Sequence, residues 1–417
     1  MDRPPQQPLP RRDLPHRLGP RPLQLHLLAQ ASTLFSSRAA LPSWKSGSFV
    51  WKPHLQSAAE QLRSQIDGVD AEVFARALTV EARRRIDGFL RGVEAYRRHP
   101  YQRDLPAPPA VWEEGTTRLI DYASAGTAGG PVLVVPSLVN RAYILDLATK
   151  RSFLRYLAAK GLRPFLVDWG APGAAEKGFS LDDYVVGRLG RALDQVLRLG
   201  GRPVVLGYCM GGLLATGLAG LRQPDVKGLV TLATPWDFHA PTPLQGRLVA
   251  AMRQPLEDAL AVHGEIPVDL LQALFAMVDP GAIERKFRAF SALNARSARA
   301  RDFVALEDWV NDGVPLPGPT ARQCLFGWYV DNQPAKGVWR LGGELVRPRA
   351  FEKPALTIVP AKDRIVPPQS ALALADLLPH ARRRIVDSGH IGMLTGARAK
   401  TEVYAYVAKW LSLVLRH

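Results

Sequence analysis

The segment GYCMGG places a cysteine where a nucleophile could be exposed on a tight turn. Cys209 has Gly207 two positions before it, Gly211 two positions after it, and Gly212 next to that. This is the G-x-S-x-G nucleophile-elbow pattern with Cys in place of Ser. Its glycines permit a strained turn between a strand and a helix that pack closely. The apolar residues on both sides predict that strand and helix. A thiol at the helix N-terminus would be favoured as thiolate by the helix dipole.

Two other interpretations of this segment are structural. Residues 203–221 carry no charged side chain over about the length of a membrane span. Glycine recurs throughout them, which argues against a spanning helix. A short glycine pattern also occurs by chance around a buried cysteine that has no chemical role. The nucleophile interpretation therefore needs a base and an acid elsewhere in the chain.

Both partners are found downstream in the expected order of nucleophile, acid and histidine. Asp363 ends the apolar run PALTIVPAKD, and His390 ends the next run, ARRRIVDSGH. Both would lie at the carboxyl ends of parallel strands, where open α/β sheets place their sites. We therefore predict a catalytic triad in which His390 takes the proton of Cys209 and Asp363 orients the imidazole. A turn aspartate and a loop histidine are the structural alternatives.

An acyl-transfer site of this kind also needs donors for the oxyanion. We expect the backbone N–H of Met210 to supply one, since it follows the nucleophile directly. The second is expected from the loop SLVN after the apolar run PVLVVP, at the backbone N–H of Val139.

Three further residues are weaker candidates. His239 follows an apolar run in TPWDFH and could line the site. Cys324, in ARQCLFGWY, is expected to be a packing residue. Asp168, in VDWG, could be catalytic in a variant arrangement, although a turn role fits it better.

Composition limits the class of protein. The 417 residues carry a formal charge of +16, and 47% of them are hydrophobic, as in ordinary globular proteins. The charge could serve nucleic acid, an anionic surface or coenzyme A, but the arginines are dispersed and favour a solvated surface. No nucleic-acid-binding pattern is present. Two cysteines and no visible signal peptide predict a cytoplasmic protein.

The chain divides into three predicted parts. Residues 1–22, rich in Pro and Arg, are expected to be a disordered tail. Residues 23–105 show helical apolar spacing and form an N-terminal extension. Residues 106–417 form the catalytic domain, with a helical cap insertion at about 236–350. The first helix, around 23–35, could touch a membrane or a hydrophobic granule, or it could dock on the protein's own core.

Strand and helix patterns alternate within the catalytic domain. The expected strands are continuous apolar runs, which are typical of a parallel sheet covered on both faces. We predict an α/β fold with a mostly parallel sheet, helices on both faces and the helical cap insertion. Besides the strand that leads into Cys209, the expected strands lie at 116–122, 131–136, 162–169, 226–234, 354–363 and 381–390.

Several segments resemble the polyhydroxyalkanoate (poly-3-hydroxybutyrate) synthase family of the α/β-hydrolase superfamily. They are GYCMGG, VPSLVNRAYILDL, DWGAPG followed by SLDDYV, AKDRIVPPQSA and SGHIGM, in family order within residues 93–410. The resemblance implies that Cys209 carries the acyl group, that His390 is its base, and that Asp363 helps to activate the hydroxyl of the growing chain. It also implies 3-hydroxyacyl-coenzyme A as substrate, with no metal or other cofactor. The implied partners are a growing polyester chain or granule surface, and a second copy of the chain or a synthase partner subunit.

Three functions remain open from the sequence. A thiol can take an acyl group from coenzyme A by thioester exchange and keep it reactive toward an alcohol, which favours a polymerising acyltransferase. A Cys-dependent hydrolase, such as a thioesterase, a polyester depolymerase or a dienelactone-hydrolase-like enzyme, would use the same triad with water as acceptor. A noncatalytic granule-surface protein would use the basic N-terminus and not Cys209.

Overall fold

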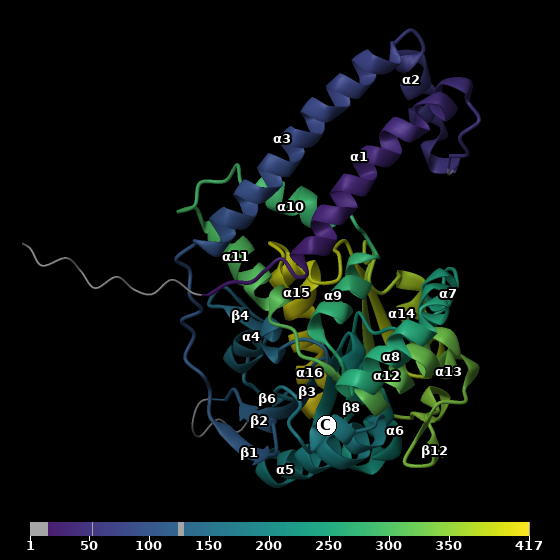
Figure 1. Ribbon diagram of the computed structural model, residues 1–417. Coiled ribbons are helices and arrows are strands. Elements are labelled where there is room, and N and C mark those ends of the chain that lie inside the picture. The colour runs from purple at the N-terminus through teal and green to yellow at the C-terminus, as the bar shows by residue number, and fades with distance from the viewer. Residues whose placement is uncertain (1–15, 52, 124–128, 417) are drawn as a thin grey trace, which may run out of the picture. The chain divides into compact units, whose positions relative to one another are not determined.

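The computed structural model describes residues 16–51, 53–123 and 129–416 (Figure 1). The chain forms two compact units. One contains Met1–Gln102 and Asp279–Asn311, and the other contains Arg103–Val278 and Asp312–His417.

The larger unit is built on an eight-stranded sheet with the order β1-β2-β6-β3-β7-β8-β13-β14. From β6 to β14 all neighbouring strands are parallel, while β1 and β2 form an antiparallel edge. The prediction of a mostly parallel α/β sheet is confirmed. The strands are β1 (Ala110–Glu114), β2 (Thr117–Asp121), β3 (Gly130–Val135), β6 (Leu162–Asp168), β7 (Val204–Tyr208), β8 (Gly228–Leu232), β13 (Ala355–Pro360) and β14 (Ala381–Val386).

Helices cover both faces of this sheet, which is why the central strands are continuous apolar runs. Two helices, α4 (Phe153–Ala159) and α16 (Ala405–Arg416), pack on one face. The other face is covered by α5 (Gly190–Gly200), α6 (Met210–Leu221) and α14 (Pro368–Leu377) (Figure 1). The strands β7, β8 and β13 between these layers are wholly buried.

The insertion between β8 and β13 is helical, as expected. It contributes seven α-helices, a π-helical segment and a 3₁₀ turn (Pro348–Ala350) to the two units, together with short two-stranded pairs. The segments are α7 (Leu244–Ala251), α8 (Arg253–His263), α9 (Val268–Ala276), α10 (Ala282–Phe290), α11 (Ala298–Asn311), α12 (Gly318–Arg322) and α13 (Gln333–Lys336), and a π-helical segment spans Gln323–Val330. Two of them, α10 and α11, belong to the other unit, so the predicted division into extension 23–105 and insertion 236–350 differs from the structure here.

In the smaller unit α10 packs against the N-terminal helices α1 (Leu23–Ser46) and α3 (Ala71–Arg97), and α2 (Gln56–Ile66) packs against α1. Helix α11 adds Ala300 and Val304 to the shared core. Its core is aromatic: the rings of Tyr96 and Phe287 lie edge to face at 5.5 Å, and those of Phe290 and Phe303 stack at 4.3 Å. Tyr96 and Phe287 come from segments far apart in the sequence. A local periodicity of apolar residues cannot predict such a contact.

The predicted disordered tail, 1–22, falls mostly on residues outside the described ones. Within 16–22, the structure differs from the prediction because Arg17 is buried. Its guanidinium contacts Asp308 at 2.6 Å and donates to the backbone carbonyl of Tyr101 at 2.6 Å. A cation that satisfies a carboxylate and two carbonyls fixes the chain entering α1.

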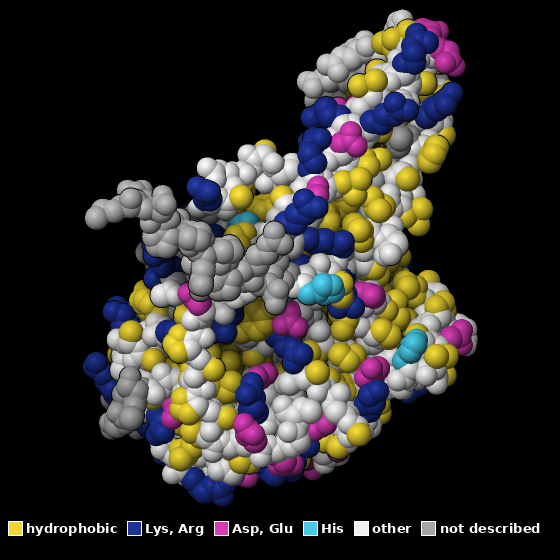
Figure 2. Space-filling view, turned by 60° about the vertical axis from the view of Figure 1, so that its left-hand side comes forward, with side chains coloured by type: hydrophobic (Ala, Val, Ile, Leu, Met, Phe, Trp, Pro, Cys, Tyr) yellow, Lys and Arg dark blue, Asp and Glu magenta, His cyan; other side chains and the backbone are white. Residues whose placement is uncertain are grey.

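Hydrophobic side chains are also exposed on the smaller unit. Leu28 and Phe35 on α1 are 63% and 73% exposed, and Val80 on α3 is 69% exposed. Figure 2 shows hydrophobic surface between the basic side chains of these helices. Among the described residues, no helix combines the length and the apolar character that a membrane span needs.

The approach of α3 to α10 gives a first testable prediction. A β-carbon at Gly92 would lie 2.0 Å from the carbonyl oxygen of Phe287. We therefore expect Gly92→Ala to force the helices apart and to lower the free energy of unfolding by about 1–3 kcal/mol. Urea denaturation measures the loss, and hydrogen exchange should locate it in α3 and α10. The matched control is Gly68→Ala, since no atom lies within 4 Å of a β-carbon there. Equal stabilities of the two variants would contradict this account.

Candidate active site

The turn between β7 and α6 has the geometry expected of a nucleophile elbow. Cys209 has φ 55° and ψ −129°, a conformation that non-glycine residues rarely adopt. The nearby glycines explain how it is held. A β-carbon at Gly207 would lie 2.4 Å from the carbonyl oxygen of Gly211, and one at Gly212 would lie 1.8 Å from Thr234 Oγ1. Side chains at these positions would push α6 off the sheet.

Cys209 stands at the N-terminus of α6 as its N-cap residue. Its carbonyl accepts the Gly212 N–H at 2.9 Å, and its own N–H donates to Leu232 O at 2.9 Å. Its side chain is partly exposed, while Cys324 is buried. The helix dipole favours negative charge at this end, so the position suits a thiolate.

Asp363 and His390 are joined by a short hydrogen bond. His390 Nδ1 lies 2.6 Å from Asp363 Oδ2, and both side chains are buried. The other carboxylate oxygen, Oδ1, accepts the backbone N–H groups of Ile365 and Val366 at 2.9 Å each. The carboxylate is thus held in place and stabilised as an anion inside the protein.

The same imidazole also faces the thiol. Because Nδ1 meets Asp363, Nε2 is the nitrogen left to face Cys209, which lies close enough to affect the pKa of His390. Burial disfavours the imidazolium, but the facing Cys209 thiolate and Asp363 carboxylate outweigh burial and raise the pKa of His390 to about 10. The structure therefore brings together the three residues that the sequence singled out, in an arrangement that favours a thiolate–imidazolium pair.

Two tyrosines that the sequence analysis did not single out border this group. The Tyr208 hydroxyl donates to the backbone carbonyl of His390 at 3.3 Å, and the two rings lie 5.2 Å apart. Tyr329 is close enough to Cys209 for the thiolate to raise the pKa of its phenol, after the larger effect of burial. The position of Tyr208 directly before the nucleophile could have indicated from the sequence that it borders the site. Tyr329 lies in the insertion, where nothing in the sequence indicates that it comes near Cys209.

His239 lies beside the π-helical segment of the insertion that carries Tyr329. Its Nε2 is 3.1 Å from the backbone carbonyl of Tyr329 and 3.2 Å from that of Val330. Its ring therefore contacts the π-helical segment, and a place for His239 in the lining of the site stays a prediction.

The loop after β3 is the predicted source of an oxyanion donor. The Val139 N–H contacts the Ser137 hydroxyl at 3.4 Å, which is long for an N–H···O hydrogen bond. Ser137 Oγ also lies 3.8 Å from Met210 Sδ, so this loop and the start of α6 are neighbours. As the first residue of α6, Met210 has no carbonyl one helical turn earlier to accept its N–H. The assignment of these two N–H groups to an oxyanion remains a prediction.

The other candidates have structural surroundings. Asp168 contacts Arg118 at 2.8 Å and accepts the Gly170 N–H at 3.2 Å, as a turn residue does. Burial raises the pKa of the Cys324 thiol, which makes it a poor nucleophile. Among the described residues, no group of three or more His, Cys, Asp or Glu is placed to hold a metal ion.

The pairing of Cys209 with His390 leads to a prediction about thiol reactivity. Because the raised pKa keeps His390 protonated through pH 8, its positive charge should favour the Cys209 thiolate, and alkylation of Cys209 by iodoacetamide should depend less steeply on pH between pH 6 and pH 8 than alkylation of an unpaired thiol does. In His390→Gln the rate should rise about tenfold per pH unit over this range, as for an unpaired thiol. Peptide mass spectrometry measures both, with Cys324 as an internal reference. Asp363→Asn should spare alkylation more than turnover. Identical pH profiles for the wild type and His390→Gln would rule out the pair.

The chain is similar to known proteins of the α/β-hydrolase fold. The family described as "alpha/beta hydrolase fold" matches residues 130–397. The chain is 33% identical over 289 residues to the poly(3-hydroxyalkanoate) polymerase subunit PhaC of Allochromatium vinosum, covering 68% of this chain and 80% of that protein. It is 32% identical over 316 residues to the PhaC of Thiocystis violacea, covering 73% and 87% of the two chains. A solved structure of a putative non-heme bromoperoxidase BpoC from Mycobacterium tuberculosis is 20% identical, with a TM-score of 0.44 and coverage of 75% and 99%.

Proposed function

Because the chain belongs to the poly(3-hydroxyalkanoate) polymerase family of the α/β-hydrolase superfamily, we propose that it polymerises 3-hydroxyacyl-coenzyme A through a thioester on Cys209. The family is one of enzymes that make polyhydroxyalkanoates. The observation that carries the specific proposal is the contact of His390 with both Cys209 and Asp363.

In the first half-reaction the thiol takes the acyl group. His390 Nε2 accepts the Cys209 proton, and the thiolate attacks the carbonyl carbon of the acyl thioester. The oxyanion that forms is proposed to be stabilised by the N–H groups of Met210 and Val139. The bond from carbon to the coenzyme A sulfur then breaks, and coenzyme A leaves as its thiol with the proton from His390. One thioester replaces another, so the acyl group stays activated.

In the second half-reaction the acyl group passes to an alcohol and not to water. His390 removes the proton of a 3-hydroxyl group, whose oxygen attacks the carbonyl carbon of the Cys209 thioester. The bond from this carbon to the Cys209 sulfur then breaks, so the ester is released and the sulfur recovers the proton from His390. Asp363 is proposed to act through His390, because its Oδ1 is occupied by two backbone N–H groups and its Oδ2 by the imidazole. This is a narrower role than direct activation of the chain's hydroxyl, which the resemblance implied.

The surroundings of Cys209 support transfer over hydrolysis. Tyr208 is buried and Tyr329 is partly buried, and the ring of Phe238 packs against both Tyr329 and Trp328. An apolar surround of this kind limits access of water to an acyl-enzyme. A Cys-dependent hydrolase would need the same triad, so the choice of acceptor separates the two functions.

The exposed apolar side chains of α1 and α3 support a role for the smaller unit at a polyester granule surface. Leu28, Phe35 and Val80 would lose water there and gain contact with an apolar polymer. A cytoplasmic location and assembly with a second copy or a partner subunit belong to the same proposal.

Product analysis tests the proposal directly. Purified protein with 3-hydroxybutyryl-coenzyme A, alone and with a synthase partner subunit, should release coenzyme A and form oligoester. Mass spectrometry should find a 3-hydroxybutyryl group or its oligomers on the Cys209 peptide. Cys209→Ala should lower turnover by about a thousandfold or more, while Cys324→Ala should keep it. Free 3-hydroxybutyrate without oligoester under both conditions would establish the hydrolase instead.

A second variant separates acylation from elongation. Asp363→Asn should still accumulate the acyl group on Cys209, because the elbow and the thiol remain, but elongation should fall by about 10³–10⁴-fold. The measurement is the ratio of acylated Cys209 to oligoester in rapidly quenched samples. Equal losses in both steps would show that Asp363 is needed for acylation as well.

A further inference from the structure

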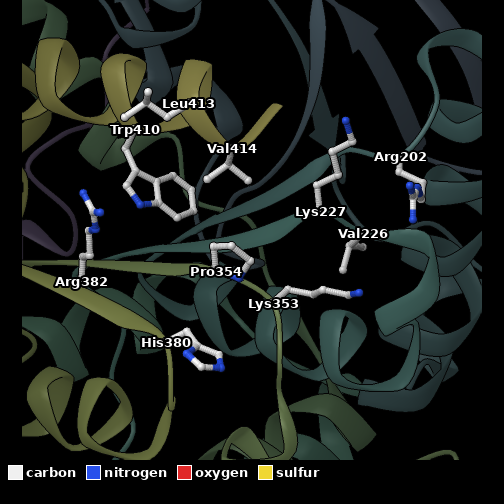
Figure 3. A pocket seen from close by; sticks show the side chains of 10 residues that line it. All are labelled: Arg202, Val226, Lys227, Lys353, Pro354, His380, Arg382, Trp410, Leu413 and Val414. Atoms are coloured by element: carbon white, nitrogen blue, oxygen red, sulfur yellow. The ribbon is translucent and has the colours of Figure 1, made fainter. Parts of the chain in front are cut away.

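A basic pocket lies at the edge of the sheet opposite Cys209 (Figure 3). Its volume is about 540 Å³, within the range of about 300–1,000 Å³ typical of small-molecule sites. It opens at the amino ends of β7, β8, β13 and β14, whereas Cys209, Asp363 and His390 follow the carboxyl ends of these strands. The lining residues are Arg202, Val226, Lys227, Lys353, Pro354, His380, Arg382, Trp410, Leu413 and Val414.

The charges in this pocket are all of one sign. Arg202, Lys227, Lys353 and Arg382 come from four separate strand starts, and no acidic side chain is among the lining residues. Within the described part of the chain, the side chains of Arg202, Lys353 and Arg382 form no hydrogen bond or ion pair, and the Lys227 ammonium donates only to the carbonyl of Leu415 at 3.3 Å. Cations gathered without a counter-charge repel one another, and an anion bound among them would relieve this repulsion.

Neighbouring arginines show that the lack of partners is local. Two residues along β14 from Arg382, Arg384 lies over the ring of Tyr406 at 4.3 Å and donates to the Glu402 carbonyl. Between them, Arg383 is paired with Asp376 on the other face. Arg382 has no such contact, although it points to the same side of the strand as Arg384.

The floor of the pocket is apolar. Trp410, Leu413 and Val414 come from the last turns of α16, and Val226 and Pro354 come from the strand starts. Figure 3 shows the Trp410 ring, Pro354 and Val414 in the middle, with the basic side chains on both sides. Leu413 is 46% exposed, so apolar surface at this floor is open to solvent.

We infer that this pocket binds a single-chain amphiphile whose head is an anion, a carboxylate or a phosphate. The alkyl chain covers Trp410 and Leu413, and the head lies beside Arg202 and Lys353. Burial of the alkyl chain and pairing of the charged head would each contribute to the affinity. An uncharged amphiphile lacks the second contribution, and an inorganic anion lacks the first. Because the strands separate the pocket from Cys209, this ligand is distinct from the acyl-enzyme.

Calorimetric titration of the full chain tests the inference with octanoate and octyl phosphate below their micelle concentrations. We expect at least one of them to bind, with octyl glucoside and inorganic phosphate each weaker by about tenfold or more. The stronger of the two anions identifies the head group. Cys209→Ala should bind as the wild type does, so the result does not depend on the proposed polymerase activity.

Variants separate the contributions of charge and chain. The triple variant Arg202→Gln, Lys353→Gln and Arg382→Gln should weaken binding by about tenfold or more. The charge-matched control is Arg296→Gln, Lys336→Gln and Arg349→Gln, whose side chains are exposed elsewhere. Leu413→Asn should weaken the binding of octyl phosphate and leave the affinity for inorganic phosphate unchanged.

Several outcomes would overturn the inference. They are no heat of binding with either anion, equal binding of octyl glucoside and octyl phosphate, and equal effects of the two triple variants. If inorganic phosphate binds as tightly as octyl phosphate, the pocket is a site for anions alone and the alkyl chain adds nothing to binding. An octaglutamate peptide that binds more tightly than either amphiphile would make the surface a docking site for acidic protein segments.

Discussion

The close approach of α6 to the sheet is the constraint on which the site depends. A β-carbon at Gly211 would lie 2.1 Å from the carbonyl oxygen of Val135, and one at Gly212 would meet Thr234. With so little space, the chain from β7 to α6 must reverse at one residue, and Cys209 takes the positive φ that this requires. Its thiol is therefore positioned by glycine packing and backbone hydrogen bonds, which remain in place while its side chain reacts.

A buried carboxylate beside a buried imidazole is stable only because its charge is compensated. Asp363 is held by two backbone N–H groups and by His390, and His390 is held in turn by Cys209 on its other side. Removing one member leaves an unpaired charge in an apolar surround, which is costly. The three residues thus behave as one unit, with the proton on the imidazole at neutral pH.

The sequence predicts the parts of the fold that have a local signal. The apolar runs gave β3, β6, β8, β13 and β14, and the order Cys, Asp, His fits the strand ends that the structure brings together. Contacts between distant segments have no such signal. The antiparallel edge strand β1, the packing of residues 279–311 with the N-terminal helices, and the burial of Arg17 depend on pairings across the chain. Tyr329 likewise reaches Cys209 only through the tertiary fold.

The parallel sheet also separates two kinds of electrostatics. Elsewhere in the larger unit, basic side chains neutralise carboxylates, as Arg103 and Arg155 do at the buried Asp146. At the amino edge the cations lack such partners. Lys353 lies just before β13 and Asp363 lies just after it. The six residues of β13 span about 20 Å, which separates the basic pocket from the triad. At this distance the cations of the amino edge act only weakly on His390, whose pKa is raised by Cys209 and Asp363. The protonation of the triad is therefore set by its own members, and an anion bound at the opposite edge would leave it nearly unchanged.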